Sequence, residues 1–131
     1  MSKRVALIGH CGPDSSYLRL AVQKAGRDVQ VVAADDQAEL RKALESGVDL
    51  LLFNRVLDYG FEEEEGVEVI RRLRAENPTL KMMLVSNYPE SQAEAVAAGA
   101  LPGFGKREIG SARVTQLIRE ALAQEPSSKP A

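Results

Sequence analysis

The segment 48–54, VDLLLFN, constrains the fold of this chain more than any other stretch of its sequence. Five of the six residues before Asn54 are apolar, and polar residues do not alternate with them. A run of this kind predicts a strand that is buried on both faces, as in the centre of a parallel sheet. Because ligands bind just beyond the carboxyl ends of such strands, Asn54 stands where a functional side chain is expected.

Strand-like and helical patterns alternate along the rest of the chain. Short apolar runs that predict strands lie at 5–8, 29–34, 48–54, 80–85 and 101–105. Apolar residues recur at helical spacing between them, with expected helix starts at Asp14 or Ser15, Asp36, Ser91 and Ser111, and expected ends at Gly26, Gly47 and Asn77. Five strand–helix pairs in strict alternation predict an α/β fold, a doubly wound five-stranded parallel sheet of flavodoxin-like order 2-1-3-4-5 with helices on both faces.

The length of the chain, 131 residues, suits one domain with one substantial core, which we place at residues 1–124. Residues 125–131 are rich in proline and serine and have little to bury. This composition predicts a disordered C-terminal tail. The sequence indicates no second domain and no internal repeat.

The composition argues against several classes of partner. The formal net charge is −2 and the lysines and arginines are spread along the chain, so nucleic acid is not expected as a main partner. No apolar run approaches the roughly 20 residues that span a bilayer, and none near Met1 suits a signal peptide. Cys11 is the only cysteine, which excludes an internal disulfide. These features predict a cytoplasmic protein without membrane contact.

The predicted topology brings polar residues from several strand ends to one edge of the sheet. These residues are Gly9, His10 and Cys11 after the first strand, Asn54 after the third, Ser86 after the fourth and Lys106 after the fifth. An amide, a hydroxyl and an ammonium group that converge would suit an oxyanion or a phosphate group. Polar residues also mark the point at which any strand leaves the core, so the pattern alone leaves both interpretations open.

These landmarks resemble those of the receiver domains of two-component response regulators, over essentially the whole globular length of the chain. Ser86 and Lys106 match the hydroxyl residue and the lysine of that family. The segment 95–100, AVAAGA, resembles the alanine-glycine-alanine stretch that precedes the family's fifth strand. The spacings from His10 to Asn54 and from Asn54 to Lys106 also correspond to those of the family.

The departures from the family pattern fall at the residues that carry its chemistry. The family's phosphate-accepting aspartate is replaced by Asn54, and its magnesium-binding acidic pair is replaced by Gly9 and His10. The loop after Asn54 is also longer than usual and has no proline. A neutral amide cannot replace a carboxylate as the nucleophile in acyl-phosphate formation. Magnesium requires several hard, preferably anionic oxygens, so we expect weak or absent magnesium binding and no other cofactor.

The sequence therefore predicts a pseudo-receiver, a non-enzymatic signalling domain that acts by protein–protein contact and does not depend on aspartyl phosphorylation. We expect Asn54 to accept a hydrogen bond from Lys106 or Ser86, because a buried amide or ammonium without partners is costly. The resemblance implies that the helix 4–strand 5–helix 5 face, roughly Ser91 to Gln124, contacts partners. A homodimer through this face is one expected form.

Two alternatives remain open at this stage. In the first, the chain is a phosphorylatable receiver that uses Asp58 or Ser86 in place of Asn54. In the second, it is a cysteine-based phosphotransfer domain. Residues 11–16, CGPDSS, resemble the phosphocysteine loop of sugar-phosphotransferase IIB domains, and Cys11 would be placed at a helix N-terminus, where an anionic group is favoured.

Overall fold

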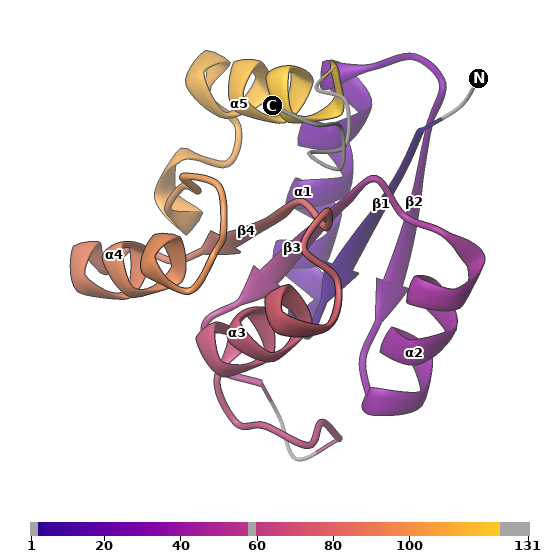
Figure 1. Cartoon of the computed structure of the whole chain (residues 1–131). Coiled ribbons are helices and arrows are strands. Elements are labelled where there is room, and N and C mark those ends of the chain that lie inside the picture. The colour runs from indigo at the N-terminus through magenta and orange to yellow at the C-terminus, as the bar shows by residue number, and fades with distance from the viewer. Residues whose placement is uncertain (1–2, 58–59, 124–131) are drawn as a thin grey trace, which may run out of the picture.

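The computed structural model of the protein describes residues 3–57 and 60–123. Asp58 and the predicted tail at 125–131 therefore lie outside the described residues. In the described part, parallel strands and α-helices alternate along the chain (Figure 1). No helix of this part is both long and apolar enough to cross a membrane.

One parallel sheet organises the fold, with four strands in the order β2-β1-β3-β4. The strands are β1 (Lys3–Ile8), β2 (Val29–Ala34), β3 (Leu50–Asn54) and β4 (Met82–Val85). The two central strands pair with Ile8 opposite Phe53, and β3 pairs with β4 so that Asn54 lies opposite Val85. The carboxyl ends of β1, β3 and β4 therefore meet at one edge of the sheet.

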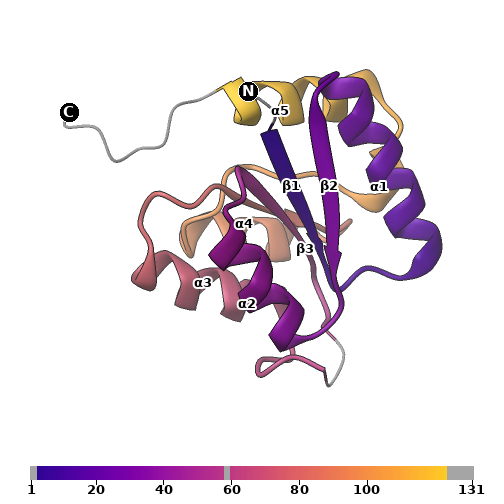
Figure 2. The ribbon, with the colours of Figure 1, turned by 90° about the vertical axis from the view of Figure 1, so that its right-hand side faces the viewer.

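Helices cover both faces of this sheet, as predicted. The helices are α1 (Gly12–Ala25), α2 (Gln37–Ser46), α3 (Gly66–Glu76), α4 (Pro89–Ala97) and α5 (Ala112–Ala123). One face packs against α1 and α5, and the other packs against α2, α3 and α4. Figure 2 shows the strands between α1 on one side and α2 and α3 on the other.

The apolar run in β3 supplies both cores. Leu51 and Phe53 pack in the cluster on the α2–α3–α4 side, while Leu50 and Leu52 pack in the cluster on the α1–α5 side. All four side chains are fully buried. Complete burial of a side chain of this size stabilises the fold by about 1.5–3 kcal/mol relative to exposure. The interpretation of this segment as a central strand is confirmed.

The predicted fifth strand is the main error of the sequence interpretation. Segment 101–105 runs beside β4, but only Phe104 pairs with Val85, as an isolated parallel bridge. Leu101 N donates to the Met82 carbonyl at 2.8 Å, and Ser86 N donates to the Phe104 carbonyl at 2.9 Å. The next donor to β4 is Phe104 N, which reaches the Leu84 carbonyl at 3.3 Å, where a regular ladder would use Gly103 N, so the ladder is interrupted between these contacts. The observed order is therefore 2-1-3-4, and a short 3-10 helix, η1 (Lys106–Glu108), follows the segment.

The helix boundaries follow local signals in most places. The Asp36 carboxylate accepts a hydrogen bond from Glu39 N at 2.8 Å, so the predicted cap of α2 is confirmed. Ser111 Oγ likewise accepts from Val114 N at 3.3 Å at the start of α5. The expected ends at Gly26, Gly47 and Asn77 are the observed C-caps of α1, α2 and α3.

Two helices begin earlier than predicted. The N-cap of α1 is Cys11, without a side-chain cap hydrogen bond, so Asp14 and Ser15 lie inside the first turn and are not caps. Helix α4 begins at Pro89, before Ser91. In both helices a proline lies in the first two positions, where a missing N–H has little consequence because those N–H groups have no partner within the helix.

Candidate functional site

The structure divides the predicted site between two neighbouring cavities at the carboxyl edge of the sheet. A cavity of about 510 Å³ is lined by ten residues that include Gly9, His10, Cys11 and Asn54. A smaller cavity of about 260 Å³ is lined by eight residues that include Asn54, Ser86 and Lys106. Asn54 is shared by both cavities, so it lies between the two halves of the expected site.

The Asn54 side chain is held by backbone groups. Its Nδ2 atom donates to the Gly9 carbonyl oxygen at 3.1 Å and to the Val56 carbonyl oxygen at 3.0 Å. Its Oδ1 atom accepts from Arg55 N at 3.1 Å. An ionised carboxylate at this position would have no proton to offer the two carbonyl oxygens. These contacts therefore use both the N–H donors and the oxygen acceptor of the Asn54 amide.

The prediction that Asn54 accepts a hydrogen bond from Lys106 or Ser86 is wrong. The Lys106 ammonium group pairs with Asp14 Oδ2 at 3.1 Å. Ser86 is buried, and its Oγ accepts from Tyr88 N at 3.1 Å. The anionic partner of Lys106 therefore lies in the first turn of α1. Asn54 forms its hydrogen bonds with backbone groups instead.

Asp14 is a site residue that the sequence interpretation missed, because it was assigned as a helix cap. Partial burial opposes ionisation of this carboxyl group, but the hydrogen bond and charge of Lys106, with a hydrogen bond from Cys11, lower its pKa overall. The available signal was an acid in the first turn of the helix that follows β1. No sequence pattern paired it with a lysine so far along the chain.

A side chain at position 9 would be strained and would displace Leu57. Gly9 has a φ of 72°, in the left-handed region that favours glycine. A Cβ atom built on it would lie 2.5 Å from Leu57 Cδ2 and 3.5 Å from Phe61 Cε2. Leu57 and Phe61 belong to the long loop between β3 and α3, and both are buried. The loop therefore places apolar groups where a side chain at position 9 would project.

The His10 ring is buried at the carboxyl edge of the sheet. The side chain is only 7% exposed, and its Nε2 atom lies 2.8 Å from the Leu52 carbonyl oxygen, to which it donates as N–H. The Nδ1 atom is buried and has no hydrogen-bond partner among the described residues. Burial lowers the pKa of His10 to about 4, although the Leu52 carbonyl opposes the shift. The imidazole is therefore neutral at pH 7.

Comparisons with known proteins identify the fold. No family model matches the chain, and no curated protein matches it. Its solved structural neighbours include the signal receiver domain of a DNA-binding response regulator from Colwellia psychrerythraea, with a TM-score of 0.74, 14% identity, and coverage of 93% of this chain and 99% of that one. A response regulator from Thermotoga maritima gives a TM-score of 0.70 at 22% identity, covering 95% and 100% of the two chains.

A third neighbour is the beryllofluoride-activated NtrC4 receiver domain dimer, with a TM-score of 0.74, 16% identity, and coverage of 91% and 95%. At these identities the likeness shows the fold. The chain has the flavodoxin-like fold of response-regulator receiver domains.

The residues present do not fit the magnesium ion that this fold family implies. The Gly9 position offers no ligand, and the His10 Nε2 atom is engaged by the Leu52 carbonyl. The Asn54 Oδ1 atom is neutral and is engaged by Arg55 N. Across residues 3–57 and 60–123, no group of three or more His, Cys, Asp or Glu side chains could hold a metal ion. Magnesium prefers anionic oxygens in octahedral geometry, and this edge does not supply them.

Proposed function

We propose that this chain is a receiver-like signalling domain that acts through protein–protein contact and takes no phosphate at Asn54. The observation that carries the proposal is the contact of Leu57 with the space above Gly9. Leu57 thereby places an apolar side chain where an acidic ligand would lie. The missing nucleophile and the missing metal-binding acid then belong to a single rearranged site. In this site the long loop occupies the space of the acid.

The same proposal makes the protein a non-enzymatic domain that needs no cofactor and works in the cytoplasm. Asn54 provides no nucleophile, because its neutral amide lacks the anionic oxygen of a carboxylate. The buried, neutral ring of His10 provides no anionic oxygen for a metal. Binding to protein partners is the activity that such a domain retains.

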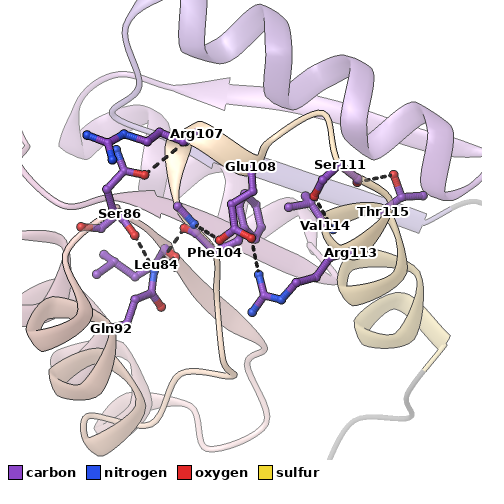
Figure 3. A network of polar contacts seen from close by, with 12 residues as sticks. Leu84, Ser86, Gln92, Phe104, Arg107, Glu108, Ser111, Arg113, Val114 and Thr115 are labelled. Atoms are coloured by element: carbon purple, nitrogen blue, oxygen red, sulfur yellow. Dashed lines mark hydrogen bonds and ion pairs between the residues drawn. The ribbon is translucent and has the colours of Figure 1, made fainter.

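The partner surface is proposed to lie on α4, segment 101–105, η1 and the start of α5. A largely apolar groove of about 850 Å³ opens there. Its lining includes Val96, which is 45% exposed. Gln92 supports the groove, since its Nε2 atom donates to the Leu84, Ser86 and Phe104 carbonyl oxygens at 2.9, 3.1 and 3.1 Å (Figure 3).

Charged residues border this groove. Arg113 pairs with Glu108 at 2.7 Å (Figure 3). Arg107 N donates to Asn87 Oδ1 at 3.1 Å. An apolar groove with a charged border is the composition of a protein–protein interface. A second copy of the chain is one candidate partner, and nucleic acid is not proposed because the net charge is −2.

Incubation with a small-molecule phosphodonor and magnesium, followed by intact mass measurement, tests the proposal. A phosphorylatable receiver domain treated in parallel is the positive control. We expect no phosphoryl adduct on this protein. A near-stoichiometric adduct would overturn the proposal, and peptide mapping would then separate a rerouted receiver using Asp58 or Ser86 from a phosphotransfer domain using Cys11.

A further inference from the structure

Helix α4 packs against the rest of the protein with few apolar side chains. Within its range, Pro89–Ala97, the one buried residue is Ala95, whereas α3 buries five residues and α5 buries four. Alanine brings a single methyl group to such a contact. Because hydrophobic stabilisation grows with the apolar area that is buried, apolar packing holds α4 only weakly against the sheet. Polar contacts therefore have a larger share in fixing the position of this helix.

The Gln92 side chain makes such polar contacts with two other segments. Its Nε2 atom lies 2.9 Å from the Leu84 carbonyl oxygen and 3.1 Å from each of the Ser86 and Phe104 carbonyl oxygens (Figure 3). A primary amide has two N–H groups, so at least one of them is shared between two acceptors. Leu84 lies in β4 and Ser86 follows that strand, while Phe104 lies in segment 101–105. One side chain thereby links α4 both to the end of β4 and to the segment beside it.

The interrupted ladder beside β4 makes room for this amide. Phe104 N reaches the Leu84 carbonyl oxygen at 3.3 Å, which is longer than the 2.9 Å contact of Gln92 Nε2 with the same oxygen. A Cβ atom at position 103 would overlap that oxygen and would lie 3.0 Å from Gln92 Oε1. Glycine at position 103 therefore allows both the close approach of the chain and the placement of the Gln92 side chain. The irregular segment and the contacts of Gln92 are two parts of the same arrangement.

The same contacts connect the two walls of the groove of about 850 Å³. Helix α4 forms one wall with Ala93, Val96 and Ala97, and residues 102–105 form the other. Gln92 lies on the first wall and donates to the Phe104 carbonyl oxygen of the second, so its hydrogen bonds set the distance between them. A binding site whose walls are already fixed loses less conformational entropy when a partner binds.

We propose that Gln92 is a positioning residue that holds this groove open in the unmodified, unbound protein. The groove then needs neither a covalent modification nor a movement of α4 before a partner binds. Because the competent state is already the populated one, a partner binds with its full intrinsic affinity. The use of the groove by a partner rests on the proposed function, whereas the positioning of α4 by Gln92 does not.

Backbone ¹⁵N relaxation of the unsubstituted protein is the first test. We expect order parameters of about 0.85 along α4 and at Phe104, equal to those of α3 and α5, because hydrogen bonds of Gln92 compensate for the small apolar contact. Values near or below about 0.6 along α4 would overturn the proposal, since one wall of the groove would then be mobile on its own. This measurement needs no variant, so it does not depend on the folding of a substituted protein.

Gln92→Met tests the side chain itself, because methionine keeps the length and helix propensity of glutamine but has no N–H donor. We expect the order parameters along α4 to fall towards about 0.6 and the amide signals of residues 93–97 and 104 to shift, while the signals of α1 and β1 stay native. A purely global loss of stability would leave these order parameters unchanged. Gln23→Met, at an exposed position of α1, is the matched control and should change neither quantity in α4.

Native order parameters and shifts along α4 in the Gln92→Met protein would contradict the assignment. Gln92→Glu has the shape of glutamine but no N–H donor at pH 7, and it provides the same reading if the methionine variant does not give a native spectrum. Covalent phosphorylation is read separately by mass. A phosphoryl adduct would overturn the proposed function and leave the role of Gln92 intact, whereas a rigid α4 in both variants would do the reverse.

Discussion

Replacing Asn54 with aspartate tests whether the amide is structural. In the folded protein the Nδ2 atom donates to the Gly9 and Val56 carbonyl oxygens. The Asn54→Asp variant at pH 7 loses both hydrogen bonds, each worth about 0.5–1.5 kcal/mol, and brings a negative oxygen towards two carbonyl oxygens. We expect the free energy of unfolding to fall by about 2–3 kcal/mol, measured by urea denaturation.

The pH dependence of this deficit has a definite sign. Protonation of the introduced carboxyl group restores one donor, so its pKa in the folded state should lie above the value of about 3.9 for an unfolded aspartate. Between these pKa values the folded state binds more protons than the unfolded state. Stability therefore rises as the pH falls through the raised pKa, and the deficit relative to the unsubstituted protein becomes smaller.

Asn87→Asp is the matched control. The Asn87 side chain uses only its oxygen, which accepts from Arg107 N at 3.1 Å, and its nitrogen donates to no atom of the described residues. We expect a change within about 0.5 kcal/mol, as for an ordinary surface substitution. If Asn54→Asp proved as stable as Asn87→Asp at pH 7, the amide contacts would not be the reason for asparagine at position 54.

Substitutions at Gly9, Leu57 and His10 test the contacts at the carboxyl edge of the sheet. Gly9→Ala should cost about 2 kcal/mol or more, because φ is 72° and the new Cβ meets Leu57. In a Leu57→Ala background the cost should be smaller, and strictly additive effects in this double-mutant cycle would refute the contact. His10 has a pKa of about 4 in the folded state, against about 6.5 in the unfolded state. As the pH decreases through this window, the unfolded state gains a proton that the folded state does not bind, so the free energy of unfolding falls by about 3 kcal/mol. His10→Gln should flatten the pH dependence of the urea midpoint between these values, and an unchanged profile would contradict the assigned burial.

Folding to a receiver-like sheet was determined largely by local sequence. Leu50 to Phe53 specify a strand buried on both faces, because an uninterrupted apolar run leaves no polar face for solvent. Asp36 and Ser111 begin helices through contacts within four residues of chain. Gly47 and Asn77 end helices by similarly local means. Such features depend on neighbours in sequence, so the sequence alone predicts them.

The error at the fifth strand also had a local signal. Pro102 stands inside the predicted strand, and a proline within an apolar run favours an edge strand or no strand. Gly103 next to it is required by close approach of the chain to the Leu84 carbonyl. The apolar pattern at 101–105 predicted correctly that the chain runs beside β4, but overestimated the pairing.

The contacts of the site were decided by tertiary structure alone. The sequence showed that Asn54 and Gly9 replace acids, but not that Asn54 binds backbone carbonyls or that Leu57 closes the space above Gly9. It showed Lys106 but not its pairing with Asp14. These contacts join segments that are distant in sequence, and no local propensity or periodicity encodes which of several nearby polar groups will meet. That choice depends on the path of the loops once the sheet has formed.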